Sequence, residues 1–384
     1  MTVIENKYER KIRYENANTA AEEKIISGLI EKKDDLIKKT EKRIDVEFFD
    51  QIRIFKGNND ELYTVFDKMY KACEFYDKKF AAIVTQELRE VSWCEGKKKT
   101  DIKNVIRIMV HQNNSDCKYR DIPFFSNKKR LNEIMLKELS ELLDDSKCSY
   151  KEFKGGKMDV IFSPRAAAYF VHEILGHPLE LDLISTNKSI YKEKNIDEKI
   201  MPEYINVSEC PEDTRQIGMI YGDYDDEGKD LINTDIIKGG VLVSPITYKR
   251  CSEMKRETLN RMHNFILRPN ESGCSLDRII ARSSNAIVID DVLYGYYNLA
   301  MGDFMLYCGK SRRVKNGEVV SYHFGVRINE KILELKNIIK EIGNDYNATL
   351  GFCSKQNQII TVGMGAPSMV LSDINVTGGS ENVI

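Results

Sequence analysis

The sequence lacks the features that would place a chain in a membrane, outside the cell or on nucleic acid. It has no run of about 18 apolar residues, which argues against a membrane-spanning helix. Residues 1–7 are polar and have no apolar core of the kind that secretory signals need. The 58 Lys and Arg nearly balance the 60 Asp and Glu, so composition favours neither nucleic acid nor an anionic membrane as a partner. We therefore expect a cytoplasmic protein that binds neither.

Paired cysteines, repeats and low-complexity tracts are absent as well. The 9 cysteines are an odd number without a Cys-x-x-Cys pair, which fits reduced thiols better than a disulfide framework. A chain of 384 residues is too long for one ordinary core, and its 42% hydrophobic content suffices for two. The polar, glycine-containing segment 154–157 is the best boundary, so we predict domains at 1–154 and 155–384.

Apolar periodicity predicts an α+β fold. For the N-terminal α/β domain we expect helices at 18–43 and 126–146 and strands at 46–55, 81–94 and 102–111. The C-terminal domain should be β-rich and receive one helix, over 164–176, after a strand at 158–162. Beyond it we expect hairpins at 236–243 and 314–320, a helix at 328–343, a strand at 359–362, a turn at 363–367 and a last strand at 368–376.

Histidine is scarce, with 5 in the chain, yet two of them flank a glutamate in the apolar run His172-Glu173-Ile174-Leu175-Gly176-His177. Neutral imidazole is the commonest zinc ligand, and a carboxylate beside the metal can accept a proton from metal-bound water. The run therefore indicates a metal-dependent hydrolase, with His172 and His177 as ligands and Glu173 as general base.

The five-residue spacing of the two histidines constrains the shape of the helix that carries them. Residues five apart on a regular α-helix point about 140° away from each other, so a shared metal requires a helix that is distorted or ends between them. Gly176 tolerates irregular backbone, and Pro178 disfavours the α conformation at His177. We predict that His172 lies in the last helical turns and that His177 folds back from the helix end. Glu180 or Asp182 would then orient a ligand.

Spacing alone leaves two matters open. Five-residue spacing is not a standard ligand pattern, so two histidines near a helix end without any metal are about as well supported as a metal site. If a metal is bound, its third ligand remains unassigned among Glu180, Asp182, His263, His323 and any of the cysteines.

Over residues 155–384 the chain resembles the TldD/PmbA family of cytosolic metallopeptidases, and in particular the catalytic TldD-type subunit. The run from His172 to Glu180 is similar to the family's HExxxH block, and further blocks follow in the family's order. These blocks are 158–164, 225–228 with 238–242, 261–264, 302–304 with 316–317, 351–358, 362–367 and 376–379. The N-terminal region resembles the family only loosely and is shorter.

The resemblance implies a Zn²⁺ cofactor held by His172, His177 and Cys353, with Glu173 as catalytic base. Arg261 and Asn264 become candidates for holding substrate backbone or the oxyanion, although ordinary structural hydrogen bonding suits them equally. Family members act on unfolded or leader-type peptides, which strand addition to a sheet edge can grip. They work as dimers, often with a sister subunit that lacks the HExxxH residues, so this chain is expected to form a homodimer or such a heterodimer.

The chain departs from the family at a few positions. Pro178, Leu181 and Ser354 stand where the family usually has glycine, and none of these changes removes a ligand. His263 stands where the family often has threonine, either as one more proton donor or as a surface residue. Two other functions remain open: a non-catalytic peptide-binding or chaperone subunit, and a thiol enzyme with Cys353 as nucleophile and a histidine as its base.

Overall fold

The computed structural model describes residues 5–15, 79–93, 97–112, 115–123, 136–143, 149–192, 195–209, 224–225, 229–251, 258–356 and 358–378. The chain divides into two compact units, Met1–Cys148 and Ser149–Ile384. The predicted boundary after residue 154 lies within the second unit and stays a prediction. The helix predicted at 18–43 and the strand predicted at 46–55 lie outside the described residues.

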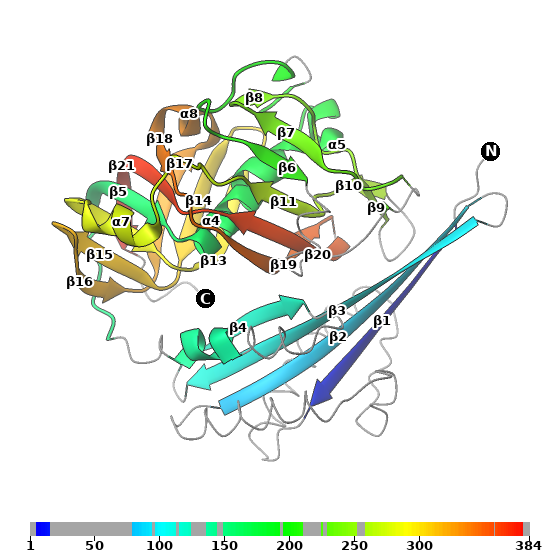
Figure 1. Cartoon of the computed structure of the whole chain (residues 1–384), viewed down its shortest axis with the longest axis horizontal. Coiled ribbons are helices and arrows are strands. Elements are labelled where there is room, and N and C mark those ends of the chain that lie inside the picture. Colours follow the sequence, from blue (N-terminus) through cyan, green and yellow to red (C-terminus); the bar gives the residue numbers. More distant parts are fainter. Residues whose placement is uncertain are drawn as a thin grey trace. The chain divides into compact units, whose positions relative to one another are not determined.

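The described strands of the first unit form an antiparallel sheet in the order β1-β2-β3-β4 (Figure 1). Their bounds are Glu5–Glu15, Lys79–Trp93, Lys97–Gln112 and Ser115–Pro123. β2 and β3 pair from Lys79↔His111 to Trp93↔Lys97 and confirm the strands predicted in this region. Residues 136–143 are helical, and Leu139, Leu142 and Leu143 in them are buried, which agrees with part of the helix predicted at 126–146.

The second unit contains a nine-stranded sheet among its described residues, in the order β13-β14-β17-β21-β5-β12-β15-β16, with β18 also paired to β21. β5 lies at its centre because Met158, Val160 and Phe162 are apolar and buried, and β5 pairs parallel to β12 and antiparallel to β21. The strands in sequence order are β5 (Gly156–Phe162), β12 (Asn285–Ile289), β13 (Val292–Asn298), β14 (Asp303–Cys308), β15 (Ser311–Lys315), β16 (Glu318–His323), β17 (Val326–Lys331), β18 (Ile339–Ile342) and β21 (Met369–Gly378).

A six-stranded sheet in the described part of the same unit has the order β19-β20-β11-β6-β7-β8. Its strands are β6 (Val207–Glu209), β7 (Thr234–Lys238), β8 (Val241–Leu242), β11 (Asn264–Leu267), β19 (Asn347–Lys355) and β20 (Gln358–Ala366), and β9 (Lys249–Cys251) pairs separately with β10 (Thr258–Asn260). The predicted hairpins are confirmed: Gly239 and Gly240 turn β7 into β8, and Asn316 and Gly317, both at positive φ, turn β15 into β16.

One helical segment packs between strands of the two sheets (Figure 1). α4 (Pro164–Phe170) begins at Ser163, whose hydroxyl accepts the Ala166 N–H, and it contacts β19 and β20 on one side and β5 and β13 on the other. It continues as η3 (Val171–Gly176), η4 (His177–Leu179) and α5 (Leu181–Ser185). Because this segment is apolar around most of its circumference, it is buried on several sides and fixes the candidate site inside the core.

Two predictions near the C-terminus are wrong. The helix predicted at 328–343 is instead β17, a short turn of η6 (Ile332–Glu334) and α8 (Leu335–Ile338), and then β18. Its apolar residues have helical spacing and most of them are buried, but Leu333 is 50% exposed. Pairing of β17 with β14 and β21 outweighs the local helical preference. The turn predicted at 363–367 is also absent, because β20 continues to Ala366. Gly365 serves close packing, since a Cβ there would lie 1.9 Å from the Tyr346 hydroxyl.

Another helix in the described part of the second unit is α7 (Leu276–Ala281), which covers a smaller cluster of buried side chains around Ile161 and Val288. In the described part of the chain, every helix falls short of the length and apolar character that crossing a membrane requires. The molecule is therefore β-rich with short helices, within the α+β class that the sequence predicts.

Candidate metal centre

The segment that bears the two histidines is a π-helix. In η3 the backbone N–H of His177 donates to the carbonyl of His172, which is the five-residue hydrogen bond of a π-turn. This bond places residues five apart one above the other, so the two imidazole rings lie on one face, with centroids 5.0 Å apart. The π-turn is therefore the helix distortion that two histidines five residues apart need in order to share a metal ion.

The chain reversal predicted at His177 does not occur. His177 has φ −55° and ψ −42°, inside the α region despite the proline that follows, and Gly176 is also α-helical. The helix widens into a π-turn instead of ending. Gly176 lets Met262 pack closely against this turn, since a Cβ there would lie 2.0 Å from the Met262 Sδ. Pro178 is accommodated at the start of the 3₁₀ turn η4, where a missing N–H costs little.

Cys353 reaches the same place from β19. Its sulfur lies 3.2 Å from Nε2 of His177, although 176 positions separate the two residues in the sequence. One ligand atom each from His172, His177 and Cys353 can be chosen so that all lie within 4.8 Å of one another, and all three residues are buried. The ligand atoms of tetrahedral zinc are roughly 3.3–3.8 Å apart, so small side-chain adjustments would close this cluster around one ion.

His172 supports the same interpretation. Both of its ring nitrogens are buried and lack a hydrogen-bond partner among the described residues. Burial, with His177 and Arg261 nearby, lowers the pKa of His172 well below its ordinary value, so the ring is neutral. A buried neutral imidazole with no partner is costly unless something accepts its lone pair. The donor set of two imidazoles and a thiol therefore fits a zinc ion.

His177 is oriented by a carboxylate on the other side of its ring. Nδ1 of His177 lies 3.1 Å from Oε2 of Glu180, a side chain with no solvent exposure. Burial opposes a charge on His177, but Cys353 and Glu180 outweigh it and raise its pKa well above the ordinary value. A hydrogen bond from Nδ1 to Glu180 leaves Nε2 facing the Cys353 sulfur, which is the arrangement that a metal-binding histidine needs.

Glu173 lies at the edge of the cluster, where its side chain keeps 14% exposure. One of its carboxylate oxygens is 3.7 Å from Nε2 of His177, so it faces the space between the candidate ligands. Tyr297 of β13 covers this corner: its ring stacks on His177 with centroids 5.8 Å apart, and its hydroxyl hydrogen-bonds to Glu173. Burial, with Glu173 and Cys353 nearby, raises the pKa of Tyr297, so the phenol stays protonated and donates that bond.

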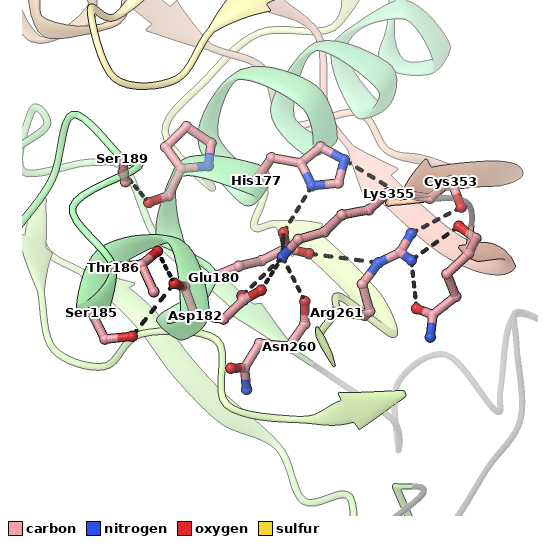
Figure 2. A network of polar contacts seen from close by, with 12 residues as sticks. His177, Glu180, Asp182, Ser185, Thr186, Ser189, Asn260, Arg261, Cys353 and Lys355 are labelled. Carbon is pink, nitrogen blue, oxygen red and sulfur yellow. Dashed lines mark hydrogen bonds and ion pairs between the residues drawn. The ribbon is translucent and has the colours of Figure 1, made fainter. Parts of the chain in front are cut away.

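Arg261 lies next to the cluster and hydrogen-bonds to the strands around it. Its guanidinium donates from Nη2 to the Cys353 carbonyl at 2.9 Å and from Nη1 to Oε1 of Gln358 at 2.6 Å. Nε of Arg261 also lies 3.9 Å from Oε1 of Glu180. These contacts hold the β19–β20 hairpin against the segment that carries the histidines (Figure 2).

Asn264 is the first residue of β11, and His263 comes directly before it. Asn264 is fully buried, and the N–H groups of both residues donate to Glu209, whose pKa burial raises to about 7. The surface position considered for His263 is wrong: it is 2% exposed, and its ring contacts the Arg250 guanidinium. Placing a polar ring there is possible because Arg250 supplies a buried donor.

Two other residues considered as a third ligand make contacts outside the cluster of His172, His177 and Cys353. Asp182 contacts Lys355, and His323 is held between Ser321 and the Lys151 carbonyl. Three contributors were missed from the sequence: Lys355, Gln358 and Tyr297. Lys355 and Gln358 lie just beyond Cys353, inside the block 351–358 that resembles the family, so the sequence did point to them. No sequence signal pointed to Tyr297, because only the folding of the chain brings its strand, β13, to the site.

The second unit is β-rich and buries two imidazoles and a thiol beside a carboxylate, and these groups form a candidate metal centre. Residues 155–378, more than half of the chain, match the family model described as the PmbA/TldA metallopeptidase C-terminal domain. The chain belongs to the PmbA/TldD family.

Curated relatives agree with this membership, and a solved structure shares the fold. The chain is 27% identical over 236 residues to a protein of Methanothermobacter thermautotrophicus named "Metalloprotease", covering 58% of this chain and 51% of that one. It is also 27% identical over 240 residues to the "Zinc metalloprotease TldD homolog" of Saccharolobus solfataricus, covering 59% and 52%. The chain thus spans about half the length of the curated relatives it matches. The crystal structure of TldE from Thermococcus kodakarensis shares the fold, with a TM-score of 0.63, 14% identity, and coverage of 84% of this chain and 75% of that one.

Proposed function

We propose that this chain is a zinc-dependent peptidase of the TldD type that cleaves unfolded or leader-type peptides. The observation that carries the proposal is the convergence of His172, His177 and Cys353 within 4.8 Å, next to Glu173. The buried, unpartnered nitrogens of His172 support a bound ion rather than two ordinary core histidines. In family terms, the chain would be the active subunit, because it keeps both histidines and the glutamate.

Each residue has a distinct task in this proposal. Bound zinc would supply Lewis-acid polarisation of a water molecule and of the substrate carbonyl. Glu173, partly open to solvent, would accept a proton from the attacking water and pass it to the leaving amine. Tyr297 would hold the Glu173 carboxylate through its hydroxyl, and Glu180 would keep His177 in the orientation that exposes Nε2. Arg261 would hold the strand that carries Cys353.

A peptide substrate fits the position of β13. This strand stands at the end of the strand order in the nine-stranded sheet, with β14 as its neighbour among the described residues, and it carries Tyr297 to the site. A strand at a sheet edge can pair with an extended peptide through main-chain hydrogen bonds, which favours unfolded chains over particular side chains. The proposed partner is a second copy or a sister subunit of the family, and the reducing cytoplasm suits a site that depends on a free Cys353.

The test combines metal analysis with cleavage of an unfolded peptide. Wild-type protein should retain about one zinc per chain and cleave, and a zinc chelator should stop cleavage reversibly. Cys353→Ala should lose both zinc and activity, whereas Cys274→Ala, which removes a thiol outside the cluster, should lose neither. Glu173→Gln should keep zinc and lose cleavage. A fully active Glu173→Gln variant, or wild-type protein that retains no zinc, would exclude the proposed mechanism.

The 3.2 Å approach of Cys353 to His177 also favours a second candidate, a thiol enzyme in which His177 activates the sulfur. The same experiment separates the two functions. A thiol enzyme would keep its activity in the chelator and lose it to a thiol-alkylating reagent. A non-catalytic peptide-binding subunit would hold zinc and bind peptide without cleaving it, even with a sister subunit present.

A further inference from the structure

Lys355 is a largely buried lysine that joins three segments of the chain next to the candidate metal centre (Figure 2). Its ammonium lies 2.8 Å from Oε2 of Glu180, 2.8 Å from the carboxylate of Asp182 and 3.2 Å from the Asn260 carbonyl. The side chain of Lys355 is 9% exposed and that of Glu180 is 0% exposed. An ammonium with three donors therefore has three acceptors in a site largely closed to water.

The position of Lys355 links it to the sulfur ligand. Cys353 and Lys355 are two residues apart on β19, so their side chains leave the same face of the strand. The Cys353 sulfur faces His177, while the Lys355 ammonium reaches the carboxylate on the far side of that imidazole. Cys353 therefore contacts the His177 ring directly, whereas Lys355 contacts Glu180, which in turn contacts the other side of that ring.

The positive charge of Lys355 balances the carboxylates of Glu180 and Asp182. A buried carboxylate is costly unless it is paired and hydrogen-bonded, and Glu180 is such a group. Asp182, whose side chain is 24% exposed, places a second carboxylate beside the same ammonium. The guanidinium of Arg261 is also beside Glu180, but its Nε lies 3.9 Å from Oε1, beyond hydrogen-bond distance. Among the lysine and arginine side chains of the described part of the chain, Lys355 is therefore the one that hydrogen-bonds to Glu180. Without it, Glu180 would face the negative charge of Asp182 and lose one of its two side-chain hydrogen bonds, the other being to His177.

We infer that Lys355 is a positioning residue for the proposed metal centre: it holds Glu180 so that His177 presents Nε2 beside the Cys353 sulfur. This inference rests on the proposed function and adds a residue that governs how tightly the ion is held. Partners that orient a metal-binding histidine change metal affinity by about 10- to 100-fold when they are removed. A side chain that merely stabilised the fold would lower the unfolding temperature without this loss of affinity.

The experiment measures the zinc Kd of the full chain by competition with a chromophoric chelator, with zinc alone as the probe. Lys355→Met keeps the length of the side chain and removes its charge, and its zinc Kd should rise about 10- to 100-fold. Lys340→Met is the matched control, because Lys340 forms an exposed ion pair with Asp159 and should change the Kd by about twofold at most. Thermal unfolding of each variant reports whether it is folded.

The Glu180→Gln variant tests whether Lys355 acts through Glu180. It should weaken zinc binding by itself, and Lys355→Met added to it should weaken binding no further, since both changes remove one linked interaction. If Lys355→Met fails to fold, Glu180→Gln still decides, because an unchanged zinc Kd there overturns the inference. Wild-type affinity in Lys355→Met, or additive losses in the double variant, would also overturn it. Wild-type protein without zinc affinity would instead refute the proposed function itself.

Discussion

At the residue scale, Tyr297 is the side chain that connects the candidate base to a candidate ligand. Its ring stacks on His177 and its hydroxyl binds Glu173, so one residue restrains two groups whose relative position the chemistry depends on. The two contacts are separable, because phenylalanine keeps the ring and lacks the hydroxyl.

Tyr297→Phe should lower kcat for peptide cleavage about 10- to 100-fold, since a base displaced by a fraction of an ångström loses much of its effect. Zinc content should not change, because the variant keeps all three candidate ligands and the stacked ring. Single-turnover cleavage with metal analysis of the same samples gives the measurement. Tyr294→Phe on the same strand is the control, as Tyr294 is 41% exposed and stacks on Tyr307. Equal kcat values for the Tyr297→Phe variant and the wild type would show that the hydroxyl does not serve Glu173.

At the scale of the element, the π-turn makes a five-residue histidine spacing compatible with one metal ion. The turn is built from packing as well as hydrogen bonding. Gly176 lies against Met262 and Phe265, and its missing side chain leaves room for Met262, which is 1% exposed. The absence of a side chain at Gly176 therefore lets Met262 pack directly against the widened helix.

Gly176→Ala should destabilise the protein by about 1–3 kcal/mol, because the added methyl group overlaps Met262 in a well-packed core. The better helix propensity of alanine acts in the opposite direction and is smaller, about 1 kcal/mol. Urea unfolding measures the difference. Gly176→Ala combined with Met262→Ala should cost less than the sum of the single changes, since the second substitution makes room for the first. Additive costs would mean that the contact with Met262 does not limit this position.

Elements that depend on local signals were predictable from the sequence, and those that depend on distant pairing were not. Ser163-Pro164 predicts the start of α4, and Asn316-Gly317 predicts a hairpin, because each fixes its own backbone. At 328–343 the periodicity is helical, yet strand partners from elsewhere decide the structure. The site follows the same rule. The histidines and Glu173 form one local motif, whereas residue spacing alone could not select Cys353, and nothing local indicated that Tyr297 would join them.

At the scale of the whole molecule, all the residues of the candidate centre belong to the second unit. That unit has its own core, which includes the β5 side chains and the segment with the histidines. Residues just before the predicted boundary at 154 belong to it as well. The Lys151 N–H donates to the Tyr322 carbonyl at 2.8 Å, the Lys151 carbonyl lies 2.7 Å from Nδ1 of His323, and Phe153 packs edge-on against the same ring.

A fragment of residues 149–384 should therefore fold and bind zinc, because it contains the core and all three candidate ligands. A fragment of residues 155–384 should be less stable by roughly 3–5 kcal/mol, since it lacks the buried Phe153 ring and the hydrogen bonds of Lys151. Urea unfolding of both fragments, with zinc-affinity measurements on each, compares the two boundaries directly. Equal stability would favour the boundary after residue 154. Loss of zinc binding from the longer fragment would show that the first unit supports the centre, and the two units would then have to be treated as one functional body.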